Sequence, residues 1–160
     1  MSSISQEFLT KVKEIGKRLG IDYRYLLSVM QFESGLNPQA INKWTKATGL
    51  IQFMPSTAHE LGTTCDELYK MTDVQQLDYV EKYFNPYKGK LDSLSEVYMA
   101  VLWPRAALDK DQDSTLFIKG TKAYDQNPMD WNKDGRVTET EAAAKVQKYF
   151  DEIYSKYPKE

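Results

Sequence analysis

The stretch VMQFESGLNP, residues Val29 to Pro38, ends an apolar helical pattern with one acidic side chain, Glu33. Counting back from Glu33 by helical steps leads to Met30 and Leu26, so the carboxylate continues the stripe that should face the core. Burial among apolar side chains disfavours the charged form of a carboxyl group and raises its pKa. Such a group suits a general acid that must hold a proton at neutral pH and then give it away.

A second interpretation of Glu33 is structural. A glutamate in the last turn of a helix often bends back to solvent or pairs with a nearby cation, here Lys43 or Lys46. Periodicity alone does not separate this interpretation from a catalytic one.

Length and composition predict one globular domain spanning residues 1–160. The net charge of -2 and the pI near 5.6 argue against nucleic acid as a partner. The longest apolar run, 97–103, is far short of the roughly 20 residues that span a bilayer, so we expect no membrane insertion. The single cysteine, Cys65, excludes an internal disulfide. We expect a monomer.

The hydrophobic pattern predicts a mainly α-helical fold. A helix over 8–19 is followed by one from an N-cap at Asp22 to Ser34, and residues 36–54 form a loop that lines a site. Capping signals then open short helices, and a buried central helix covers 94–102. The short helices are expected over 55–61, from Thr64 onward, and from Thr72 to about Phe84. The pattern also predicts an edge strand at 115–119 and a final helix over about 139–154.

Two motifs in fixed order carry a family resemblance. FESGLNPQAIN, followed by GLIQFMPSTAHELG, is similar to the paired motifs of the soluble lytic transglycosylase and goose-type lysozyme superfamily. A third match is VYMAV, residues 97–101, where the family usually has Ala-Tyr-Asn-Ala-Gly. Together the matches cover the chain from about Ile21 to Pro104. The resemblance implies a lysozyme-like helical domain that acts on the glycan strands of bacterial peptidoglycan.

The resemblance also implies roles for individual residues. Glu33 corresponds to the catalytic acid/base, and Ser34 to the residue that helps hold the active-site end of its helix. The expected substrate-binding residues are Ser34, Gly49, Gln52, Met54 and Tyr98. Two positions depart from the family pattern, because Met99 replaces the usual asparagine and Val101 the usual glycine, which puts substrate contacts of that asparagine in doubt.

Aromatic side chains stack on sugar rings, so exposed ones are candidate glycan contacts. Trp44 and Tyr124 are the two that we expect in this role, although most aromatic residues serve the core. Met54 and Tyr98 each have the same structural alternative.

The number of nearby carboxylates bears on the reaction. Glycosidases ordinarily use two, but Ser34 through His59 contains no Asp or Glu. By the resemblance, Glu33 alone would protonate the oxygen between N-acetylmuramic acid and N-acetylglucosamine and, assisted by the substrate's 2-acetamido group, would leave a 1,6-anhydromuramyl end. The alternatives are a hydrolase in which a remote Asp92 or Asp125 activates water, and a non-catalytic calcium-dependent glycan-binding module.

Near the C-terminus, DWNKDGRVTETE, residues 130–141, has the pattern of an EF-hand calcium loop. The expected Ca²⁺ ligands are Asp130, Asn132, Asp134, the Arg136 carbonyl and Glu141. Pro128 makes a full entering helix doubtful, so we expect an EF-hand-like loop with a structural role. The alternative is a solvated acidic turn capped by Thr138 and Glu141.

The N-terminal sequence MSSISQEFLTKVKE has no basic region followed by an apolar one, so no secretory signal is expected. Because peptidoglycan lies outside the membrane, we expect a bacteriophage-encoded, endolysin-like enzyme made in the cytoplasm. It would reach the wall through a membrane lesion or in a virion.

Overall fold

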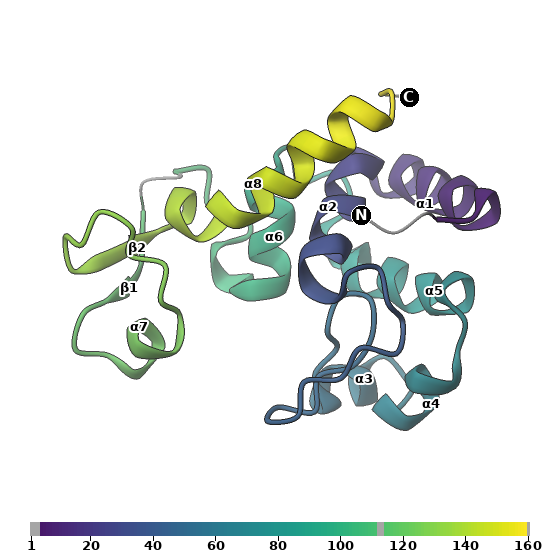
Figure 1. Ribbon diagram of the computed structural model, residues 1–160, viewed down its shortest axis with the longest axis horizontal. Helices are drawn as coiled ribbons and strands as arrows, with labels where there is room; N and C mark the ends of the chain where they lie inside the picture. Colours follow the sequence, from purple (N-terminus) through teal and green to yellow (C-terminus); the bar gives the residue numbers. More distant parts are fainter. Residues whose placement is uncertain (1–3, 112–113, 160) are drawn as a thin grey trace.

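The computed structural model describes residues 4–111 and 114–159 and is mainly helical (Figure 1). The elements in chain order are α1 (Gln6–Leu19), α2 (Tyr23–Ser34), α3 (Pro55–Glu60), α4 (Cys65–Lys70), α5 (Asp73–Phe84), η1 (Asn85–Tyr87), α6 (Leu94–Leu102), η2 (Pro104–Ala106), β1 (Thr115–Ile118), α7 (Lys122–Gln126), β2 (Arg136–Thr138) and α8 (Glu139–Lys156).

Helix α2 lies at the centre of the packing, in contact with α1, α6 and α8. Its N-terminus is capped by Asp22, whose side chain accepts from the backbone N–H of Arg24, and Gly35 ends it in the left-handed conformation. The predicted helix from Asp22 to Ser34 is therefore confirmed. One hydrophobic cluster extends from Phe8 in α1 to Ile153 in α8.

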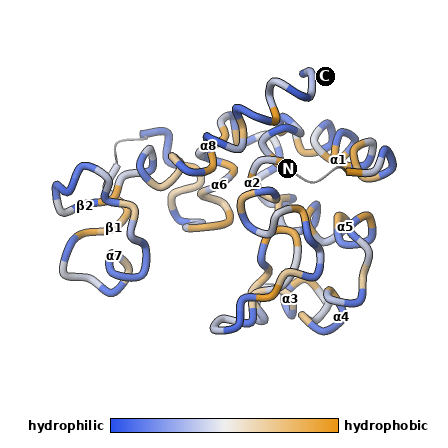
Figure 2. The backbone as a smooth tube through the Cα atoms, in the orientation of Figure 1, coloured by the Kyte–Doolittle hydropathy of each residue, from blue (hydrophilic) through white to orange (hydrophobic). Residues whose placement is uncertain are grey.

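Helix α6 is the buried central helix that the sequence predicts, and Figure 2 shows that most of its residues are hydrophobic. Its N-cap differs in one detail from a capping box. Ser93 accepts from the N–H of Glu96 as expected, but the Glu96 side chain accepts from the N–H of Asp92, at 2.7 Å, rather than reaching back to Ser93. Lys110 compensates the charge of buried Glu96 with an ion pair of 2.8 Å.

The remaining predicted elements occur within two residues of their expected bounds, including β1 and the final helix, which extends to Lys156. The helix α7, the strand β2 and the two short 3-10 helices η1 and η2 have no counterpart in the sequence prediction. Strand β2 lies inside the predicted calcium loop and pairs antiparallel with β1, so that Val137 faces Phe117. Together β1, β2 and α7 form a small extension beside α6 (Figure 1).

Among the described residues, none of the helices combines the length and the apolar character needed to cross a bilayer.

Candidate active site

Glu33 lies in the last turn of α2 and is half-buried. Burial raises the pKa of its carboxyl group to about 7, from an ordinary value of 4.5. No lysine or arginine of the described residues forms an ion pair with Glu33, and Lys43 and Lys46 are exposed. The ion-paired interpretation is therefore wrong, and the group is poised to be protonated near neutral pH.

Two tyrosines lie close enough to feel the charge of Glu33. Tyr98, on α6, is only 2% exposed, and its pKa is raised first by burial and then by Glu33. Tyr83, on α5, has a pKa raised to about 12, chiefly by burial, with Tyr87 and Glu33 adding to the effect. The expected neighbour Tyr98 is thus next to the acid, and Tyr83 is a second one that the sequence analysis missed.

The rings around this site pack edge to face. The ring of Phe32, which precedes the acid, lies 5.5 Å from that of Tyr98, centroid to centroid. Such pairs add stabilisation beyond the area they bury. Tyr98 therefore packs in the core and also lies close enough to Glu33 to be affected by its charge, while its contact with substrate stays a prediction.

Ser34 joins the end of α2 to the following loop. Its hydroxyl oxygen lies 2.8 Å from the carbonyl oxygen of Leu50, to which it donates, and 3.0 Å from that of Met30. A serine hydroxyl in a helix commonly bonds back to the carbonyl four residues earlier, as it does to Met30. The bond to Leu50 is the one that fixes the loop against the acid-bearing turn, in agreement with the holding role expected for Ser34.

A glycine is required at position 49 because the side chain of Gln76 lies close to its backbone. Its φ of +89° is in the left-handed region, and a Cβ at this position would lie 2.4 Å from the side-chain oxygen of Gln76. That oxygen accepts from the N–H of Leu50 at 2.8 Å, while the Gln76 amide nitrogen donates to the carbonyls of Pro38 and Leu68. A glycine at position 49 thus has a structural reason, and fully buried Gln76 of α5 holds both ends of the loop. Contact of Gly49 with substrate stays a prediction.

The side chain of Gln52 forms hydrogen bonds with the backbone of its own loop. Its backbone has a φ of +56°, and its amide nitrogen donates to the carbonyl oxygens of Ala40 and Gly49 at 3.1 and 3.0 Å. The donor side of this amide is therefore occupied by backbone. A hydrogen bond from substrate to its oxygen stays a prediction.

Met54 is 43% exposed, so the core-filling interpretation of this residue is wrong. With Gln52, Tyr83 and Val101 it lines a pocket of about 50 Å³. Met99, by contrast, is fully buried, and the side chain that replaces the family's usual asparagine lies in the core.

The remote carboxylates lie apart from Glu33. Asp92 forms an ion pair with Lys110, and its charge contributes to the raised pKa of Tyr25, which lies in the first turn of α2. Eight residues separate Tyr25 from Glu33, which corresponds to about 12 Å along a helix. Asp125 is exposed on α7, next to Tyr124. Of the described residues, no second carboxylate contributes to the raised pKa of Glu33.

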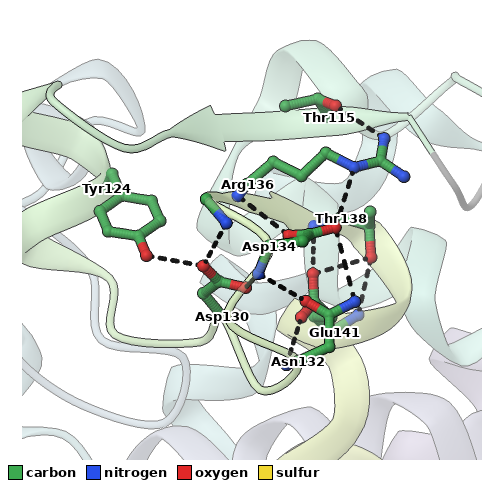
Figure 3. A network of polar contacts seen from close by, with 9 residues as sticks. Thr115, Tyr124, Asp130, Asn132, Asp134, Arg136, Thr138 and Glu141 are labelled. Carbon is green, nitrogen blue, oxygen red and sulfur yellow. Dashed lines mark hydrogen bonds and ion pairs between the residues drawn. The ribbon is translucent and has the colours of Figure 1, made fainter.

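Tyr124 lies against the acidic loop. Its hydroxyl donates to a carboxylate oxygen of Asp130 at 2.6 Å, which raises the pKa of Tyr124 to about 12 (Figure 3). The structure thus groups Tyr124 with the loop, and its contact with substrate stays a prediction.

The loop 130–141 brings its acidic side chains together. Carboxylate oxygens of Asp130, Asp134 and Glu141 all lie within 4.8 Å of one another, and Asn132 lies beside them in Figure 3. Gly135, at the sixth loop position, has a φ of +87°. No full entering helix precedes the loop, because α7 ends at Gln126, before Pro128. The Arg136 guanidinium forms an ion pair of 3.2 Å with Asp134.

The capped-turn interpretation of the loop is also present in the structure. Thr138 and Glu141 form a complete capping box at the start of α8. One oxygen of Glu141 serves this cap, while the other approaches the N–H of Asn132 at 3.4 Å. The cap and a cation site are therefore compatible with each other.

Two residues of the site had weak sequence signals. Gln76 and Tyr83 share one face of α5 with buried Val80, because 76, 80 and 83 have helical spacing. A polar side chain on an inward face needs partners, and this is the signal that could have identified Gln76.

The fold and the site define a mainly helical domain in which a half-buried acid lies at the end of a helix. Residues 11–101, more than half of the chain, match the family model described as the transglycosylase SLT domain. The chain therefore belongs to this family, whose domain is lysozyme-like.

Several curated proteins are similar over parts of the chain. The membrane-bound lytic murein transglycosylase C of Mannheimia succiniciproducens is 41% identical over 54 residues, which is 34% of this chain and 15% of that protein. The protein of the same name from Histophilus somni is 31% identical over 85 residues, 53% of this chain and 22% of that protein. The chain thus spans under a quarter of these relatives' length. No solved structure matches it significantly.

Proposed function

We propose that this chain is a peptidoglycan lytic transglycosylase that cleaves the β-1,4 bond between N-acetylmuramic acid and N-acetylglucosamine. The observation that carries the proposal is the carboxyl group of Glu33, half-buried beside Tyr98 with a pKa raised to about 7. The family membership and the names of the relatives agree with this activity.

In the proposed reaction, protonated Glu33 donates its proton to the glycosidic oxygen as the bond breaks. The acetamido group of the substrate stabilises the positive charge that develops at the anomeric carbon. Glu33, now a carboxylate, then removes the proton of the sugar's 6-hydroxyl, which closes the 1,6-anhydro ring. One residue serves first as acid and then as base, so no second carboxylate and no water are needed.

Mass analysis of the products tests this mechanism. Digestion of purified peptidoglycan should release muropeptides with 1,6-anhydro ends, each lighter by one water than the hydrated product of a lysozyme. Glu33→Gln should fold and lose nearly all turnover. Hydrated reducing ends would instead favour the hydrolase, and unchanged behaviour of Glu33→Gln would favour a non-catalytic binding module.

We also propose that loop 130–141 binds Ca²⁺ in a structural role. The support is the full twelve-residue pattern, the convergence of three carboxylates and the pairing of β2 with β1, which ties the loop to the rest of the domain. Asp130, Asn132 and Asp134, the Arg136 carbonyl and Glu141 would hold the ion.

Calorimetry and thermal unfolding test the calcium proposal. Adding Ca²⁺ should give a heat of binding, and chelation should lower Tm, because an ion that binds only the folded state stabilises it. Glu141→Gln should weaken both effects. Asp125→Asn, which changes an exposed acid outside the loop, should not. No heat together with an unchanged Tm on chelation would contradict the proposal.

A further inference from the structure

The loop after α2 presents an isolated indole to solvent. Trp44 is 92% exposed, more than any other large apolar side chain in the described part of the chain. Exposing an indole forgoes the burial that normally stabilises so large an apolar side chain. Trp44 therefore contributes little to the core, and a binding role would account for its position.

Hydrogen bonds within the turn hold the backbone that carries Trp44. The side chain of Asn42 accepts from the N–H groups of Trp44 and Thr45, at 2.9 and 3.1 Å. The backbone N–H of Asn42 donates to Ala47, and that of Lys46 donates to Asn42, which closes the turn. The turn thus fixes the backbone that carries Trp44 before any partner binds, which lowers the entropic cost of ordering the loop.

The loop is attached to the wall of the candidate active site. Ile41 and Thr48 form a β-bridge at its base, and Thr48 forms a second bridge with Phe53. Phe53 lines the small pocket beside Tyr83, and Leu50 accepts the hydrogen bond from Ser34. In Figure 1 the loop between α2 and α3 projects away from the helices at its tip. The loop that carries this tip is therefore joined at its base to the turn that bears Glu33.

The side chains beside Trp44 indicate the chemistry of its partner. Lys43 and Lys46 are exposed, and neither has an ion pair within residues 4–111 and 114–159. A peptidoglycan strand combines sugar rings, whose C–H faces stack on aromatic rings, with the free carboxylates of its peptides, which complement two lysines. A membrane surface fits less well, because the other side chains of residues 42–46 are polar, and one indole with half-exposed Ile41 at the base buries too little area for stable attachment.

We infer that Trp44, flanked by Lys43 and Lys46, is an accessory glycan-binding site that holds a peptidoglycan strand beyond the sugars at Glu33. This inference rests on the proposed function for its choice of polymer. The indole would stack on a sugar ring, and the lysines would pair with peptide carboxylates of the same strand.

Co-sedimentation with purified peptidoglycan tests the inference without relying on catalysis. The parent protein carries Glu33→Gln, so that the polymer stays intact. Adding Trp44→Ala should weaken binding about tenfold, the usual loss when a central aromatic contact is truncated. Trp44→Tyr should retain most of the affinity. Replacing Lys43 and Lys46 with glutamine should weaken binding at low salt and reduce its salt dependence.

Ile118→Ala is the matched control, because it removes a 59% exposed apolar side chain from β1. It should leave binding unchanged, and thermal unfolding should confirm that every variant is folded. Binding by Trp44→Ala within twofold of the parent would overturn the inference, as would a parent that does not sediment. Trp44-dependent binding to phosphatidylglycerol vesicles in place of peptidoglycan would assign the tip to membranes instead.

These outcomes are separate from those that test the proposed function. Products released by the unmodified chain report on Glu33, whereas sedimentation of the Glu33→Gln series reports on Trp44. Anhydro products with no effect of Trp44→Ala would leave the proposed function in place and refute the accessory site.

Discussion

The hydroxyl of Ser34 donates to the carbonyl oxygen of Leu50 across 2.8 Å, which ties the last turn of α2 to the loop that follows it. Glu33 is the neighbouring residue in that turn. The side chain of Ser34 therefore connects the acid-bearing turn directly to the loop, which Gln76 also holds.

Ser34→Ala removes this connection. We expect a loss of about 1 kcal/mol in the free energy of unfolding, the usual net value of one hydrogen bond. Turnover should fall by about tenfold or more, because small displacements of a catalytic group are costly. Ser28→Ala is the control, since Ser28 is buried in the same helix but donates only within it, to the carbonyl of Arg24. Equal turnover in the two variants would argue against the holding role.

Gln76→Leu should destabilise the chain by about 3 kcal/mol or more. The substitution leaves the N–H of Leu50 and the carbonyl of Pro38 without the side-chain partner that Gln76 provides, in a buried setting where each unsatisfied group is costly. The carbonyl of Leu68 also loses a bond but keeps the N–H of Met71. Urea unfolding measures the change. The same substitution at neighbouring Gln75, whose exposed side chain only caps α5, should cost about 1 kcal/mol or less.

The activity should depend on pH through Glu33. The acid must be protonated to start the proposed reaction, and its pKa is raised to about 7. At alkaline pH, kcat/KM should therefore fall by about tenfold per pH unit above about 7. Initial rates on a soluble peptidoglycan fragment across this range provide the measurement. A profile that stays flat up to pH 9 would show that the acid of the reaction is a different group.

The stability of the Glu33→Gln variant should depend on pH in a defined direction. The folded pKa of about 7 lies above the ordinary value of 4.5, so the folded state binds more protons than the unfolded state between these values. Stability of the unmodified chain thus falls as pH rises through this window. Glutamine does not titrate, so the variant should gain about 3 kcal/mol of stability relative to the unmodified chain between pH 4 and pH 8. Denaturant unfolding at both pH values measures this difference. The prediction would be contradicted if the variant were more stable, relative to the unmodified chain, at pH 4 than at pH 8.

The sequence by itself determined the helices and the candidate acid. Local signals suffice for these features, because the caps at Asp22 and Thr72 and the apolar spacing of α2 and α6 act within a few residues along the chain. The paired motifs likewise located Glu33 and Ser34. The twelve-residue loop pattern predicted that Asp130 and Glu141 lie close together, and their carboxylate oxygens do so.

Only the tertiary structure decided what surrounds the acid. Tyr83 and Gln76 lie about 50 and 43 residues after Glu33, and their roles arise because α5 packs beside the loop. The raised pKa of Glu33 has the same origin, since it depends on burial by side chains from several elements. Capping and periodicity are local properties that a sequence displays, whereas desolvation is a property of the assembled core.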